Sequence, residues 1–243
     1  MKNLIRIIAV VLILLAAFLI IYISACNSKS GKSETHANYT ISATGDEGIS
    51  IQMGSNAVEE SPNVNGMRFT STLAEFTTHY NEAKKALNET DYINMDNWRK
   101  HGAETTDDNG VKIQYYYYDD DNTNFTATVE IESKKILNIG FGTTMSYYMG
   151  RTENLANSDI ALEKAALMAQ SVCLYPKGST DIIKEIFRKT TTTENDILWY
   201  QGCVYKLDTQ EDQQDSKNNI MLFRIFPVTE NLRAEWNLKE YII

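Results

Sequence analysis

The sequence predicts an α+β domain in which helices pack on one face of an antiparallel sheet of about five strands. Three segments repeat apolar residues every three or four positions, which is typical of amphipathic helices. Other segments alternate apolar and polar residues, as the strands of a half-buried antiparallel sheet do. Their order along the chain is helix, three strands, two helices and two strands.

The first helix has a clear beginning. Thr72 and Glu75 fit a capping box, and the apolar stripe that follows predicts a helix to about Asn88. The stripe consists of Leu73, Phe76, Tyr80, Ala83 and Leu87. Beyond a linking stretch with Trp98, residues 111 to 143 alternate with a period of two and contain two turns. They predict a three-stranded antiparallel meander with one apolar face and one wet face.

The second half predicts two helices and two strands. Asn157 or Ser158 can cap the first of these helices, and Ser179 can cap the second. Apolar alternation then predicts strands near 197 to 207 and near 220 to 228, joined by a very polar loop. The tail from residue 232 onward fits no single element.

The amino end carries a targeting pattern. Lys2 and Arg6 precede an uncharged apolar run, which ends in Ile23-Ser24-Ala25-Cys26. This order resembles the signal peptide of bacterial lipoproteins, in which the cysteine receives a diacylglycerol and becomes the first residue of the mature chain. The resemblance implies acylation of Cys26 and an anchor in the cell membrane or outer membrane, facing the periplasm or the exterior. An uncleaved transmembrane helix is the alternative, since 19 residues from Ile7 carry no charge, and it exports the same residues.

These features divide the chain into a signal peptide at 1–25, a flexible tether at 26–64 and an exported α+β domain at 65–243. Removal of the first 25 residues removes two positive charges, so the net charge changes from −9 to −11. An acidic protein repels phosphate backbones, which argues against a nucleic-acid partner. It favours a partner protein with a basic surface.

Two cysteines remain if Cys26 carries lipid. Cys173 and Cys203 form an even pair in a compartment where disulfides persist, so we expect them to be bonded to each other. Two buried free cysteines are the alternative.

The sequence shows no set of catalytic or metal-binding residues, and we expect no enzyme activity and no cofactor. Its three histidines are scattered, and common hydrolase and phosphate-loop motifs are absent. Asp119, Asp120 and Asp121, with Glu130, partly resemble a calcium loop. The sixth position is Asn124 and the flanking segments alternate as strands, so a solvated hairpin tip fits better.

The run of tyrosines from 115 to 118 suggests a recognition surface. Alternation sends two rings to the core and leaves Tyr116 and Tyr118 on the outer face, beside Asp119, Asp120 and Asp121. We therefore expect these five residues to bind a partner. Ordinary cross-strand pairing on an exposed sheet face is the alternative.

Together these observations favour a non-enzymatic, membrane-anchored envelope lipoprotein that binds another protein, as an immunity-type protein or a subunit of an envelope complex. A hydrolase that uses only carboxylates is one alternative, because the chain has 32 acidic residues. A structural lipoprotein without a dedicated ligand is another.

Overall fold

The computed structural model describes residues 51–118, 124–144, 155–190, 196–210 and 220–241. They form an α+β fold around a seven-stranded antiparallel sheet with the strand order β3-β4-β5-β6-β9-β8-β7. The strands of this sheet are β3 Trp98–Thr106, β4 Lys112–Tyr118, β5 Phe125–Glu130, β6 Ile136–Thr144, β7 Ile197–Tyr200, β8 Cys203–Gln210 and β9 Ile220–Pro227. The predicted class is confirmed, but the predicted number of five strands is too low.

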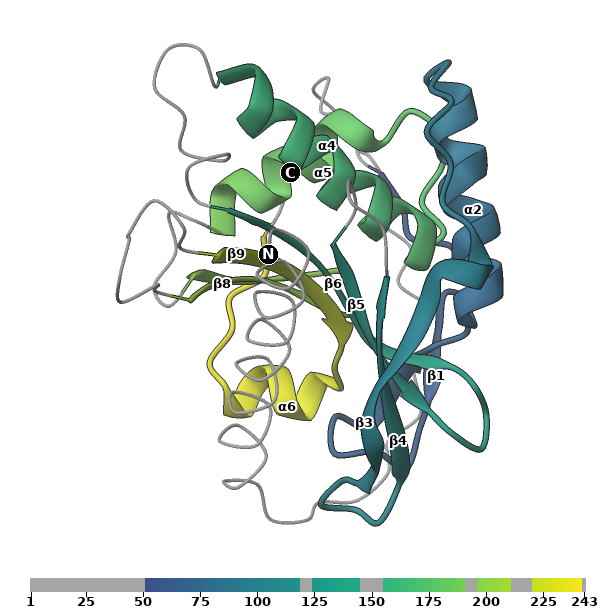
Figure 1. Ribbon diagram of the computed structural model, residues 1–243. Coiled ribbons are helices and arrows are strands. Elements are labelled where there is room, and N and C mark those ends of the chain that lie inside the picture. The colour runs from purple at the N-terminus through teal and green to yellow at the C-terminus, as the bar shows by residue number, and fades with distance from the viewer. Residues whose placement is uncertain (1–50, 119–123, 145–154, 191–195, 211–219, 242–243) are drawn as a thin grey trace.

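The helices cover both faces of the sheet, so the prediction of helices on one face was wrong. Figure 1 shows α4 and α5 on one side and α6 on the opposite side of β8 and β9. The helices are α2 Leu73–Ala86, α4 Leu155–Val172, α5 Thr180–Thr190 and α6 Glu230–Glu235. Within the described residues, no helix is both long and apolar enough to cross a membrane.

Helix α2 begins as its sequence predicts. The Thr72 hydroxyl accepts a hydrogen bond from the Glu75 amide, and the Glu75 carboxylate accepts one from the Thr72 amide. The predicted stripe is buried up to Ala83, and its rings pack edge-on against Phe125 of β5. Leu87 lies past the last turn and is 40% exposed, so the buried stripe ends at Ala83 and not at Leu87 as predicted.

The meander of β4, β5 and β6 is confirmed, but the sequence analysis missed β3, which precedes it. From Arg99 to Thr106 this strand is polar and exposed on both faces, apart from the half-buried His101. A strand that buries almost nothing has no apolar alternation to reveal it. Pairing with β4, from Trp98 opposite Tyr118 to Thr106 opposite Lys112, makes it a strand.

The segment predicted as one strand at 197 to 207 is a hairpin of β7 and β8. A two-residue turn at Gln201 and Gly202 joins them, and both residues have positive φ, 48° and 77°. Two-residue hairpins favour this backbone because its twist matches that of the strands. Glutamine is an unusual choice at a positive φ, which is why the sequence did not predict this turn.

The chain from residue 51 to 64 belongs to the folded domain, although it was predicted to lie in the tether. Ile51 and Ala57 are buried, and β1, Val58–Glu60, pairs with β2, Met67–Phe69. Gln201 holds the beginning of this segment: its Nε2 donates to the Ile51 carbonyl at 2.6 Å, and its Oε1 accepts from the Met53 amide at 2.7 Å. The folded part therefore begins at least 14 residues before the predicted boundary at 65.

Candidate functional site

The structure does not support the predicted tyrosine surface. Tyr118 is only 3% exposed and lies in the main core, where its hydroxyl accepts hydrogen bonds from the Asn94 amide and the Asn97 side chain. Tyr116 also packs against that core, while Tyr115 lies in a small cluster on the other face. Four consecutive tyrosines show no alternation of their own, so the packing of α2 and Trp98 decides which rings point inward.

The other residues of the predicted surface, Asp119, Asp120 and Asp121, lie outside the described residues, as does Cys26. Glu130, the last residue of the calcium-like pattern, is buried and binds Arg68 and Ser133. Within the described ranges, no three acidic, histidine or cysteine residues are arranged to hold a metal ion.

The outer edge of β3, where the sheet formed by the described residues ends, is the best candidate for binding. The β3 edge is nine residues long, and its side chains from Arg99 to Thr106 are exposed except at His101. Between His101 and Thr105 the register with β4 shifts at a bulge, where Gly102 has a φ of 66°. The buried Gln114 side chain supports the bulge by donating to the His101 carbonyl at 3.0 Å. The backbone N–H and C=O groups at the edge of a sheet are a template for an added strand, and charges and a bulge on that edge restrict which strands can pair with it.

The opposite edge of the sheet, at β7, is covered by the chain itself. Glu240 forms a parallel bridge with Trp199, and the Tyr241 amide donates to the Trp199 carbonyl at 2.9 Å. On the face next to this edge, the Arg233 guanidinium lies 4.5 Å from the centre of the Trp199 ring. The two edges therefore differ: the chain adds a segment of its own to β7 and leaves the side chains of β3 exposed.

The residues of the β3 edge were not among the predicted site residues. A signal was present in the sequence, because the turn residues Asp107 to Gly110 precede the meander and a hairpin needs a strand on each side of its turn. Charges are also ordered along the strand, with Arg99 and Lys100 near its start and Glu104 further on.

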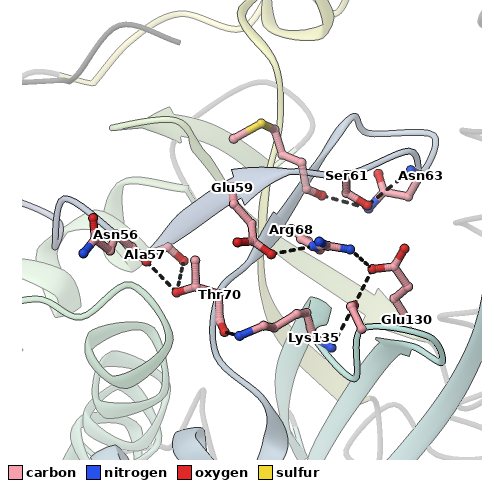
Figure 2. Close-up of polar contacts among 11 residues, drawn as sticks. Asn56, Ala57, Glu59, Ser61, Asn63, Arg68, Thr70, Glu130 and Lys135 are labelled. Carbon is pink, nitrogen blue, oxygen red and sulfur yellow. Dashed lines mark hydrogen bonds and ion pairs between the residues drawn. The ribbon is translucent and has the colours of Figure 1, made fainter. Parts of the chain in front are cut away.

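A cluster of charged and polar side chains joins the β1–β2 hairpin to the main sheet. Arg68 of β2 lies between two carboxylates, donating to Glu59 of β1 at 2.7 Å and to Glu130 of β5 (Figure 2). Burial opposes the charge of Arg68, but these hydrogen bonds outweigh it and raise the pKa of the guanidinium above its ordinary value. The nearby Lys135 ammonium donates to the Thr70 carbonyl on the same side of the hairpin. These contacts link the β1–β2 hairpin to strand β5 of the main sheet.

The structure brings the two predicted disulfide partners together without a bond. Cys173 at the end of α4 and Cys203 at the start of β8 are fully buried free thiols, with sulfur atoms 3.9 Å apart. Burial raises the pKa of the Cys173 thiol well above its ordinary value, and the neighbouring Cys203 adds to the rise. A neutral, enclosed thiol is a poor nucleophile, so this pair is unsuited to catalysis. The disulfide itself stays a prediction.

Buried tyrosines make the stability of the fold sensitive to high pH. Burial raises the pKa of Tyr115 to about 12 and that of Tyr200 to about 12, whereas the unfolded value is about 10. The folded state thus keeps protons that the unfolded state loses, so stability is complete below about pH 10 and falls as the pH rises toward 12.

We therefore expect the urea midpoint of unfolding to decrease between about pH 10 and 12. Tyr115→Phe should make this decrease less steep, because it removes one of the titrating groups. Tyr92→Phe, at a ring that is 48% exposed, is the control. An identical pH profile for the wild type and Tyr115→Phe would contradict the assignment.

Comparison with known proteins gives no relative: no family model, no curated protein and no solved structure matches the chain.

Proposed function

We propose that this chain is a lipid-anchored envelope protein that binds another polypeptide, without catalysis of its own, by adding a strand to the β3 edge. One observation carries the binding mode: the chain adds its own residues 240–241 to the β7 edge, while the side chains of β3 from Arg99 to Thr106 stay exposed except at His101. Strand addition uses main-chain hydrogen bonds for affinity and neighbouring side chains for specificity.

The membrane location rests on the Ile23-Ser24-Ala25-Cys26 pattern and its resemblance to lipoprotein signal peptides. If Cys26 carries the lipid, 24 residues separate it from Ile51, the first residue that the structure describes. A chain of that length can span at most about 80 Å. The β3 edge could then meet partners that are themselves in the envelope, as an immunity-type protein or a complex subunit requires.

The alternative of a carboxylate hydrolase gains no support from the carboxylates that surround Arg68. Glu59 and Glu130 approach each other from two strands, but the Arg68 guanidinium lies between them (Figure 2). A glycosidase keeps that space for the glycosidic bond and its water. Glu59 and Glu130 are therefore better explained as the two ends of a structural ion-pair cluster.

Capture of a partner by the full-length chain tests this function. The tagged protein would be purified from native membranes in mild detergent, together with two variants at Ala103. Ala103 lies in the bulge between the paired residues His101 and Thr105, so a change there spares the ladder with β4. Ala103→Pro removes an edge amide and should abolish capture, because proline blocks strand addition. Ala103→Ser keeps the amide and should preserve capture.

Equal unfolding midpoints for the two variants would establish that Ala103→Pro still folds. Capture that survives Ala103→Pro would place binding elsewhere on the molecule. Cleavage of envelope glycans or peptides, with no captured protein, would favour the hydrolase.

A further inference from the structure

The charges on the β3 edge are arranged in a definite order. Arg99 and Lys100 lie near the start of the strand, Glu104 lies near its end, and Asp107 and Asp108 follow in the turn. Lys100 and Glu104 are 61% and 54% exposed at their side chains, so both are available to a partner. An added strand would therefore meet positive charge at one end and negative charge at the other.

We propose that the strand added to this edge is β3 of a second copy of the chain, paired antiparallel across a two-fold axis near Gly102. This inference rests on the proposed function and names its partner. In that antiparallel arrangement the Lys100 end of each β3 lies beside the Glu104 end of the other, on either side of the bulge, and the symmetry makes the contact twice. Opposite charges on neighbouring strands stabilise their pairing, and like charges destabilise it.

The same charges exclude other arrangements. A parallel second copy in equal register would place Lys100 beside Lys100 and Glu104 beside Glu104. Charged side chains on an edge also discourage pairing with strands whose charges do not match. An antiparallel β3 has the matching order of charges.

The net charge of −9 opposes association of two copies at long range. Salt screens this repulsion beyond about 8 Å at physiological ionic strength, while facing side chains interact at much shorter distances. In a single copy the Lys100 and Glu104 charges are already 3.7 Å apart across the bulge. Dimer formation would place each of them against a second opposite charge.

Pairing through β3 also limits the number of copies in the assembly. Joining two β3 edges gives one continuous sheet that runs from the β7 edge of one copy to the β7 edge of the other. An isologous contact uses the same edge of both copies, so it closes at two copies. We therefore expect a dimer rather than a filament.

Charge reversal in differently tagged copies tests the dimer. Two full-length copies with different tags would be co-expressed, solubilised in mild detergent and purified through one tag. Lys100→Glu in both copies places Glu opposite Glu, and Glu104→Lys in both places Lys opposite Lys. Each should lower recovery of the second tag about tenfold. Lys100→Glu in one copy with Glu104→Lys in the other restores both opposite-charge contacts, and recovery should return to the wild-type level.

The mixed pair separates contacts between copies from effects within one copy. Each variant keeps its own like-charged residues at 100 and 104 in the mixture, so a defect of folding would not be repaired by mixing. The control is the exposed pair on α5, Glu185 and Lys189, whose atoms lie 3.8 Å apart. Glu185→Lys in one copy and Lys189→Glu in the other should leave recovery unchanged.

The second copy is not the partner if recovery of the second tag does not depend on the charges at 100 and 104. The same conclusion follows if the mixed pair is recovered no better than either variant alone. If Ala103→Pro then still abolishes capture of a different protein, the proposed function stands with another partner. If Ala103→Pro leaves all capture intact, both proposals fail.

Discussion

Replacing Arg68 by methionine is expected to lower the free energy of unfolding by about 3 to 5 kcal/mol. The Arg68 guanidinium neutralises Glu130, whose side chain is only 4% exposed. Methionine keeps much of the apolar stem but leaves the Glu130 carboxylate buried without its cation. Removing one partner of a buried ion pair is costly because the remaining charge cannot be solvated. Urea denaturation followed by circular dichroism measures the change.

Two further variants test whether the unpaired Glu130 carboxylate causes this loss of stability. Lys189→Met breaks an ion pair on α5 in which both side chains are more than 40% exposed, and its cost should stay below about 1 kcal/mol. Arg68→Met combined with Glu130→Met removes both buried charges and should recover most of the lost stability. If the double variant is no more stable than Arg68→Met alone, the unpaired Glu130 charge is not what destabilises the fold.

Oxidation of Cys173 and Cys203 to a disulfide is expected to raise the free energy of unfolding by about 3 kcal/mol. The bond would join two sulfur atoms that are 3.9 Å apart and would close a loop of about 30 residues. The two thiols release two protons and pass two electrons to an oxidant, a role that a thiol–disulfide oxidoreductase can fill. Since both thiols are fully buried in the folded state, we expect the bond to form while the chain folds.

Intact mass of the protein purified from its native cells without reductant should be two hydrogens lower than that of its reduced form. Denaturant unfolding with and without reductant should show the difference in stability. The double variant Cys173→Ala and Cys203→Ala is the control, since reductant should have no effect on it. The bond would be contradicted if both thiols of the unreduced native protein react with an alkylating reagent after unfolding.

Helix α2 and the meander were predictable because their signals are local. The capping box of Thr72 and Glu75 acts within one turn. The apolar stripe from Phe76 to Ala83 predicts a helix whichever element buries it. Strands β4 to β6 are adjacent in sequence and in space, so the turns between them determine their pairing.

The candidate site was less predictable because it depends on contacts between distant parts of the chain. Strand β3 buries little beyond Trp98, and its identity comes from pairing with β4. The positive φ of Gln201 is supported by hydrogen bonds to a segment that lies about 150 residues earlier in the sequence. Neither the pairing of β3 nor the support of Gln201 can be read from the residues next to them in the sequence.

The sequence alone determined the α+β class, the capped start of α2 and the hairpins of the meander, because side-chain period and turn chemistry act over a few residues. Tertiary structure decided that Tyr118 points into the core, that residues 51 to 64 join the domain and that β3 keeps an open edge. Those outcomes depend on which surfaces meet, and burial against a distant element outweighs local preference.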